Sequence, residues 1–239
     1  WCSGCNFRLA KKDLLVVFLL SLLRATTSFS LLIAYQNIAT GVASTIHFMY
    51  PLAVSLAMMF FFHEKKSLLV MLAVLMSLFG AALLSSGELE AKSGHTIVGL
   101  VAACISVFSY GGYIIGVRTT RAAQINSTVL TCYVMGMGAV LYLIGAMATS
   151  GLHLVTDGYI WLIILGLALP ATAISNITLV RAIKYAGPTL TSILGAMEPL
   201  TAVVIGVFVF KELFTLNSVI GILLILLAVG MVVFRKQKS

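Results

Sequence analysis

The sequence carries very little charge. Only 9% of its 239 residues are Asp, Glu, Lys or Arg, whereas a soluble domain has about a quarter of its residues charged. Hydrophobic residues make up 61% of the chain, and the mean hydropathy is +1.11. These values exclude water as the main solvent, and no segment is polar enough to form a separate soluble domain.

Several motifs of enzymes and metal proteins are missing. Of the four cysteines, Cys2 and Cys5 form a single Cys-x-x-Cys pair, while Cys104 and Cys132 lie in apolar segments. A zinc site needs a second pair or a histidine cluster, so we predict no metal and no cofactor. No P-loop, G-x-S-x-G or H-E-x-x-H motif is present, which argues against an ATP-driven pump and an intramembrane hydrolase.

Long apolar segments fill the rest of the chain. A helix needs about 20 apolar residues to cross a membrane, and eight such segments follow one another with short connections between them. Their lengths and periods exclude the ten-residue alternation of a membrane barrel. The predicted fold class is therefore an all-α membrane protein with transmembrane helices at 14–36, 40–62, 66–86, 97–117, 127–149, 158–183, 188–210 and 214–234.

Lys and Arg residues collect on one side when these spans alternate across the membrane. The other side receives only Lys92 and Lys211. The positive-inside rule makes the basic side cytoplasmic, so we expect a multi-pass protein of the inner membrane with both chain ends in the cytoplasm. The net charge of +8 thus reflects orientation in the lipid bilayer, and we predict no nucleic-acid partner. The basic side comprises Arg8, Lys11, Lys12, Lys65, Lys66, Arg118, Arg121, Arg181, Lys184, Arg235, Lys236 and Lys238.

An internal repeat relates the two halves. A shift of 148 residues places "YPLAVSLAMMFFFHE" (50–64) on "EPLTAVVIGVFVFKE" (198–212) without a gap. Matched apolar residues carry little weight, but rarer residues coincide as well. Ser44 falls on Ser192, Pro51 on Pro199, and Glu64 on Glu212.

The two copies should be inverted, because the predicted topology places Glu64 and Glu212 on opposite sides. The second copy also has two spans before the matched region, so the unit has five helices. We predict the last three helices of the first repeat at 1–86 and a complete second repeat at 97–239. The offset places the start of the first repeat about 50 residues before Trp1, room for two spans of ~20 residues. The chain opens without a signal-peptide pattern, and we expect it to be cut upstream.

These repeats resemble those of EamA-type members of the drug/metabolite transporter superfamily. The resemblance rests on "PLAVSLAMMFFFHE" and "EPLTAVVIGVFVFKE", each followed by a glycine-bearing span. It implies ten helices, cytoplasmic termini and a central cavity, with export or exchange of small metabolites. The chain departs from that pattern in lacking the first two helices.

Ionisable side chains within the spans are the leading candidates for function, because burying a charge in lipid is costly. Glu198, at the centre of span 188–210, could take part in proton coupling or could hydrogen-bond backbone freed by Pro199. Arg24, at the centre of span 14–36, could bind an anionic group, pair with Glu198 or contact polar residues of its own helix. His47 and Tyr50 lie one turn apart and share a helix face.

Further candidates are polar side chains and prolines near the centres of the spans. Pro51 and Pro199 each remove a backbone hydrogen bond and should kink their helices, which either exposes carbonyls to a ligand or only shapes the packing. The remaining candidates for substrate binding are Ser44, Ser192, Tyr110, Tyr113 and Asn176.

We therefore interpret the sequence as a secondary transporter of small molecules in which two inverted halves alternate about a central site. The alternatives are a membrane scaffold or receptor without transport activity and an intramembrane enzyme. The sequence predicts neither the substrate nor the oligomeric state.

Overall fold

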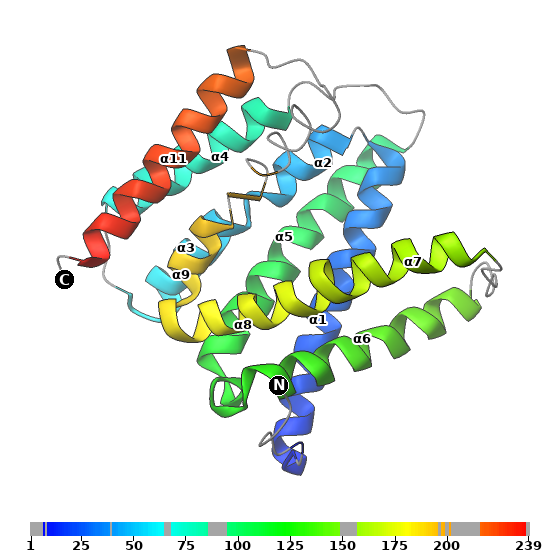
Figure 1. Cartoon of the computed structure of the whole chain (residues 1–239). Coiled ribbons are helices and arrows are strands. Elements are labelled where there is room, and N and C mark those ends of the chain that lie inside the picture. Colours follow the sequence, from blue (N-terminus) through cyan, green and yellow to red (C-terminus); the bar gives the residue numbers. More distant parts are fainter. Residues whose placement is uncertain are drawn as a thin grey trace. The chain divides into compact units, whose positions relative to one another are not determined.

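The computed structural model describes residues 7, 9–38, 40–64, 68–85, 95–148, 157–195, 197–198, 201 and 216–237. Every regular element within these residues is a helix (Figure 1). The predicted all-α class is therefore confirmed for the described part of the chain. Pro199 and most of span 188–210 lie outside it.

Five helical segments are long and apolar enough to cross a membrane. Two shorter apolar helices, Leu68–Gly80 and Val219–Met231, fall within two further predicted spans. The count of eight spans stays a prediction, because span 188–210 is only partly described. The five long segments are Lys11–Asn37, Val42–Phe61, Thr96–Thr119, Ser127–Met147 and Gly158–Ala186.

The helices divide into two compact units. Unit 1 comprises Trp1–Ala25 and Gly116–Gly187, and unit 2 comprises Thr26–Ile115 and Pro188–Ser239. Two helices, α1 (Lys11–Asn37) and α5 (Thr96–Thr119), contribute to both units.

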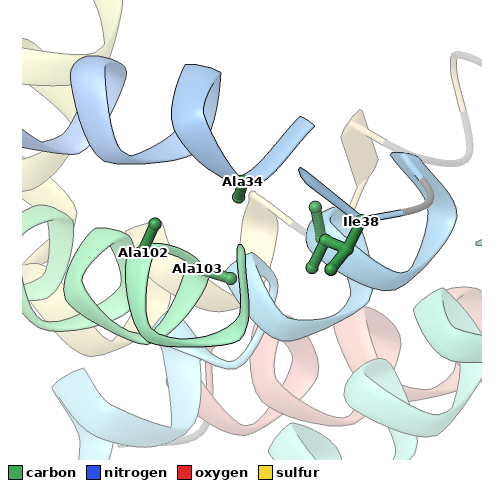
Figure 2. Packing of buried hydrophobic residues seen from close by; sticks show 5 residues of the cluster. Ala34, Ile38, Ala102 and Ala103 are labelled. Carbon is green, nitrogen blue, oxygen red and sulfur yellow. The ribbon is translucent and has the colours of Figure 1, made fainter. Parts of the chain in front are cut away.

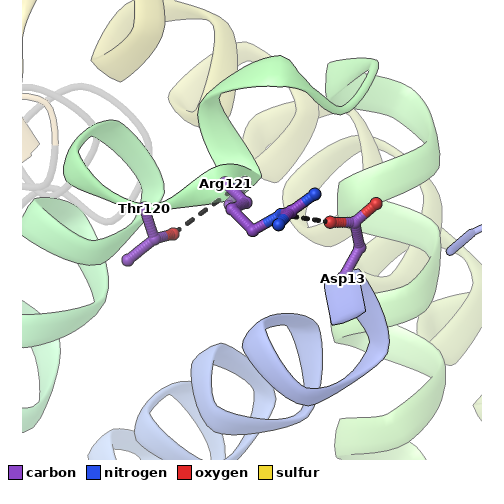
Figure 3. A network of polar contacts seen from close by, with 4 residues as sticks. Asp13, Thr120 and Arg121 are labelled. Atoms are coloured by element: carbon purple, nitrogen blue, oxygen red, sulfur yellow. Dashed lines mark hydrogen bonds and ion pairs between the residues drawn. The ribbon is translucent and has the colours of Figure 1, made fainter. Parts of the chain in front are cut away.

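In its described part, unit 1 contains the first half of α1 and five further elements. An ion pair of 3.0 Å joins Arg121 in η2 to Asp13 in α1 (Figure 3). The Thr120 hydroxyl caps η2 by accepting a hydrogen bond from the Ala122 backbone N–H. The other elements are η2 (Arg121–Gln124), α6 (Ser127–Ala148), α7 (Gly158–Gly166) followed by the π-helical η3 (Leu167–Ile174), and α8 (Ser175–Ala186).

The π-helix η3 contains Pro170. Proline cannot donate a backbone hydrogen bond and crowds the preceding turn of an α-helix. The wider π-turn is rare in proteins and occurs mostly as a local bulge within an α-helix. Large apolar side chains of α7 and η3, including Trp161, Leu162 and Leu169, are exposed. An exposed apolar surface of this size suits contact with lipid.

Within the described residues, unit 2 is built around the second half of α1, most of α5 and five other helices. Small residues allow α1 and α5 to approach: Ala34 of α1 and Ala102 and Ala103 of α5 lie in one buried cluster, which also contains Ile38 (Figure 2). The other helices are α2 (Thr40–His47), α3 (Tyr50–Phe61), α4 (Leu68–Ser85), α9 (Pro188–Leu194) and α11 (Leu216–Gln237).

Helices α4 and α11 run side by side in opposite directions (Figure 1). A Cβ atom at Gly80 would lie 2.8 Å from the Gly221 carbonyl oxygen and 2.8 Å from Ile225 Cγ1. Only a residue without a side chain fits so close to a neighbouring backbone. Elsewhere on the two helices, the buried Ala73 and Ala228 belong to one cluster.

Predicted span 40–62 is a broken helix. Helix α2 ends at His47, and α3 begins at Tyr50 with Pro51 in its first turn. Proline is well tolerated in a first turn because the N–H it lacks has no partner within the helix there. The interruption therefore lies just before Pro51 and is flanked by the candidates His47 and Tyr50.

Candidate functional site

Four of the candidate residues form one aromatic cluster in unit 2. The rings of Tyr50 and Tyr110 meet edge to face with centroids 4.7 Å apart. His47 lies 5.6 Å from Tyr50 and 5.5 Å from Tyr110, and Tyr113 stacks on Tyr110 at 6.4 Å. These separations favour attraction between aromatic rings. The break between α2 and α3 thus meets one face of α5.

The ring of His47 is held by Ser106. His47 Nδ1 lies 2.9 Å from Ser106 Oγ, and the Ser106 hydroxyl donates a hydrogen bond of 2.6 Å to the Ala103 carbonyl. Because that bond uses the only proton of the hydroxyl, Ser106 Oγ accepts from His47 Nδ1–H. The neutral imidazole therefore carries its lone pair on Nε2. Ser106 precedes Tyr110 by one helical turn, so both residues lie on the same face of α5.

The Tyr50 side chain packs against Gly195, the residue that follows α9. A Cβ atom at Gly195 would lie 1.8 Å from the Tyr50 hydroxyl oxygen and 3.1 Å from Tyr50 Cζ. Tyr50 is only 2% exposed. Gly195 directly follows α9 and occupies a turn. The Tyr50 hydroxyl therefore occupies space that a side chain at position 195 would fill, so this packing requires glycine there.

Glu198 lies three residues after Gly195 and is exposed. Its backbone N–H donates a hydrogen bond of 3.0 Å to the Gly195 carbonyl. A histidine and three tyrosines are thus brought together from α2, α3 and α5, next to the residues that follow α9.

Comparison with known families assigns the chain to a family. The sequence profile of the EamA-like transporter family matches residues 97–234, more than half of the chain. The chain belongs to the EamA-like transporter family. The family assignment and the long apolar helices together make it a multi-pass membrane protein of a transporter family, as the sequence predicted.

A solved crystal structure has the same fold as this family member. It superposes with a TM-score of 0.81 over 98% of this chain and 80% of its own, at 18% sequence identity. At that identity the likeness concerns the fold alone. A search of curated proteins found no match.

Two further predicted residues of this EamA-family chain lie in unit 2 with the cluster. The Ser44 hydroxyl is 3.3 Å from the Tyr35 hydroxyl, so it links α2 to α1. Ser192 is buried and donates a hydrogen bond of 2.8 Å to the Thr189 carbonyl within α9. Both residues stay candidates for substrate binding, although each hydroxyl has a structural partner.

The other candidates lie elsewhere in the chain. Arg24 is half-buried in the unit 1 part of α1. Asn176, also in unit 1, is 5% exposed, and its Nδ2 donates a hydrogen bond of 2.7 Å to the Thr172 carbonyl. Pro199 lies outside the described residues.

Sequence reasoning missed the partners that hold the cluster. Ser106 was overlooked because a single serine in an apolar helix has no distinctive pattern, although its spacing of four from Tyr110 was available. Gly195 is one of 20 glycines, and only the structure distinguishes it by its contact with Tyr50.

Proposed function

We propose that this chain is a secondary transporter of small molecules, with its substrate site at the aromatic cluster of His47, Tyr50, Tyr110 and Tyr113. The observation that carries the proposal is this cluster, packed against Gly195 three residues before the exposed Glu198, in a member of a transporter family. An exporter or exchanger working by alternating access fits this arrangement. We propose no enzymatic activity for this chain.

The broken helices support this location. Helix α2 ends at His47 and α9 ends at Leu194, so two predicted spans are interrupted next to the cluster. Transporters commonly place substrate or ion sites where discontinuous helices leave backbone polar groups available. Such groups are tolerated within a membrane only where protein or a polar cavity covers them.

An inverted repeat is the second part of the proposal. The shift of 148 residues carries α4 onto α11, and these two helices lie side by side in opposite directions (Figure 1). Equivalent helices of an inverted repeat run in opposite directions, because the two copies are related by an axis in the membrane plane. This arrangement supports two inverted five-helix units, the first one lacking its first two helices in this sequence.

The charge pattern supports a specific orientation. We place eight spans in the inner membrane, with both chain ends in the cytoplasm, because this topology leaves only Lys92 and Lys211 among the loop cations on the opposite side. The partners in this proposal are the lipid bilayer and a small-molecule substrate.

Transport by reconstituted vesicles tests the proposed function. The full chain is inserted into liposomes loaded with a labelled panel of amino acids, nucleosides, sugars and organic ions, and efflux is followed. We expect saturable efflux of at least one compound, absent from protein-free vesicles. Efflux equal to the protein-free control across the panel, from protein shown to be folded and inserted, would favour a scaffold or receptor.

A further inference from the structure

Unit 1 carries its positive charge at one end. Its sequence is rich in Lys and Arg, and its only carboxylates are Asp13 and Asp157. Asp157 caps the start of α7, whereas Lys184 lies in the last turn of α8, so these two residues stand at opposite ends of the helical segment Gly158–Ala186. Asp13 is therefore the single carboxylate at the end that we call the basic end. Its cations are Lys11, Lys12, Arg118, Arg121, Arg181 and Lys184.

Side-chain contacts bring these cations together. Arg118, in the last turn of α5, donates a hydrogen bond from Nη1 to the Lys184 carbonyl of α8. The Lys184 ammonium in turn donates to the carbonyl of Ile125, which directly follows η2. Arg121 in η2 pairs with Asp13 of α1 at 3.0 Å (Figure 3). The ends of α5 and α8, the helix η2 and the first turn of α1 thus meet in one place.

The cations of the basic end are accessible to a partner. Arg181 precedes Lys184 by three residues, so the two side chains lie on the same face of α8. Arg181 is exposed, as are Lys11 and Lys12 in the first turn of α1. The side chain of Arg121 is 55% exposed in spite of its ion pair. A surface with this excess of positive charge attracts an anionic partner.

Apolar side chains adjoin the basic end. Lys12, Leu15 and Leu19 follow one another at helical spacing on α1, and both leucines are exposed. Tyr185 directly follows Lys184 and is also exposed. Tyrosine is enriched where a membrane protein crosses the boundary between lipid and water. Cations at this boundary, with exposed leucines beneath them, match the two parts of a phospholipid: a charged headgroup and its acyl chains.

We propose that the basic end of unit 1 binds the phosphate headgroup of an anionic phospholipid, whose acyl chains lie along the exposed leucines of α1. Basic clusters between transmembrane helices bind such headgroups on the cytoplasmic side of membranes. The choice of the cytoplasmic leaflet rests on the proposed orientation, whereas binding itself requires only that the chain lies in a membrane. A bound headgroup would also shield the mutual repulsion of the cations and so stabilise the folded chain.

Thermal unfolding of the full chain in a neutral detergent tests the proposal. Phosphatidylglycerol and phosphatidylcholine with the same acyl chains are added in increasing amounts, and inorganic phosphate forms a third series. A ligand that binds only the folded state raises the unfolding midpoint. We therefore expect phosphatidylglycerol to raise the midpoint saturably, and less so at high salt because ions screen the cations. Phosphatidylcholine and inorganic phosphate should have little effect.

Two outcomes of this titration would overturn the proposal. Equal midpoint shifts with the two lipids would mean that the chain gains only a general lipid shell, without selection for charge. Equal shifts with phosphatidylglycerol and inorganic phosphate would mean that the basic end holds a soluble anion and makes no use of the acyl chains.

Substitutions locate the lipid at the basic end. Arg121→Gln and Arg181→Gln should each weaken the apparent affinity for phosphatidylglycerol about fivefold, the contribution of one basic residue near a charged membrane surface. Asp13→Asn removes the single carboxylate and should strengthen the affinity. Arg181→Lys keeps the charge, and Asp157→Asn changes the opposite end, so both should match the wild type. Because Arg181 is exposed, Arg181→Gln decides the matter if Arg121→Gln does not fold. Wild-type affinity in Arg181→Gln would exclude this location.

Lipid binding and transport are measured separately, so failure of one is distinct from failure of the other. Selective binding of phosphatidylglycerol by a chain that releases no compound from vesicles would retain the lipid site and remove the transport function. Efflux by a chain without lipid selectivity would retain transport and remove the site.

Discussion

The Thr189 hydroxyl donates a hydrogen bond of 2.6 Å to the Glu64 carboxylate, across 125 residues of sequence. Thr189 lies in the first turn of α9 and is 8% exposed. Glu64 follows α3, where its backbone N–H bonds to the Met58 carbonyl and His63 takes a left-handed conformation with φ of 56°. A single side-chain bond therefore links the end of α3 to the start of α9.

Loss of this bond should destabilise unit 2. Thr189→Val keeps the shape of the side chain but removes the donor, and we expect it to reduce the free energy of unfolding in detergent by about 1 kcal/mol. Thr189→Ser retains the hydroxyl and serves as the control. Equal unfolding midpoints for the two variants would show that the bond contributes nothing.

The sequence was sufficient to predict the class of fold and several members of the candidate site. Apolar length and scarcity of charge identified the membrane helices, because the cost of burying a charge in lipid acts on each segment independently. His47, Tyr50, Tyr110 and Tyr113 were selected for the same reason: polar groups are rare in such segments. Their meeting in one cluster depends on which helices pack together, which residue composition does not encode.

Local irregularities were harder to predict. Pro51 indicated a kink, but the interruption lies before it, between His47 and Tyr50. The apolar pattern around Pro170 did not predict the π-helix in which this proline lies. The local effect of a proline depends on the backbone geometry around it, and an apolar pattern specifies only that a helix is present.

Paired cysteines can test the antiparallel packing of α4 and α11, the two helices that the shift of 148 residues equates. In a background where the four native cysteines are replaced by serine, we expect oxidation to link Ala73→Cys to Ala228→Cys, because both alanines belong to one buried cluster. A disulfide needs Cα atoms within about 7 Å, so the cross-link reports direct contact between the two helices.

The control for cross-linking combines Ala73→Cys with Gly221→Cys. These equivalent positions are seven residues out of register on helices that run in opposite directions, a separation of about 10 Å along the axis at 1.5 Å per residue. Gel mobility under non-reducing conditions distinguishes the two variants. A cross-link for the control pair but none for Ala73→Cys with Ala228→Cys would contradict this antiparallel register.

Cysteine labelling can test the proposed orientation. Asn126 and Asp157 make a matched pair, because each side chain accepts a hydrogen bond from the backbone N–H two residues later, at 2.9 and 2.8 Å. The charge pattern places residue 126 in the cytoplasm and residue 157 outside. In intact cells, a membrane-impermeant maleimide should label Asp157→Cys but should label Asn126→Cys only after permeabilisation. The reverse labelling pattern would show that the chain has the opposite orientation in the membrane.

The contact between the Tyr50 hydroxyl and Gly195 gives the sharpest steric prediction. A methyl group at position 195 would meet the Tyr50 oxygen at 1.8 Å, far inside van der Waals contact. Gly195→Ala should therefore displace Tyr50 and reduce the free energy of unfolding by about 1 to 3 kcal/mol, the usual cost of overpacking. Gly136→Ala is the control, because a Cβ atom there meets nothing within 4 Å.

Tyr50→Phe should rescue Gly195→Ala. Without the hydroxyl oxygen, the nearest Tyr50 ring atom to the new methyl is Cζ at 3.1 Å, and a shift of a few tenths of an ångström relieves that contact. The double variant should consequently be more stable than Gly195→Ala alone, even though Tyr50→Phe by itself removes a polar group. A double-mutant cycle measured by thermal unfolding gives the interaction energy, which we expect to be about 1 to 3 kcal/mol for residues in direct contact. Strictly additive effects would mean that the Tyr50 hydroxyl does not occupy the space beside Gly195.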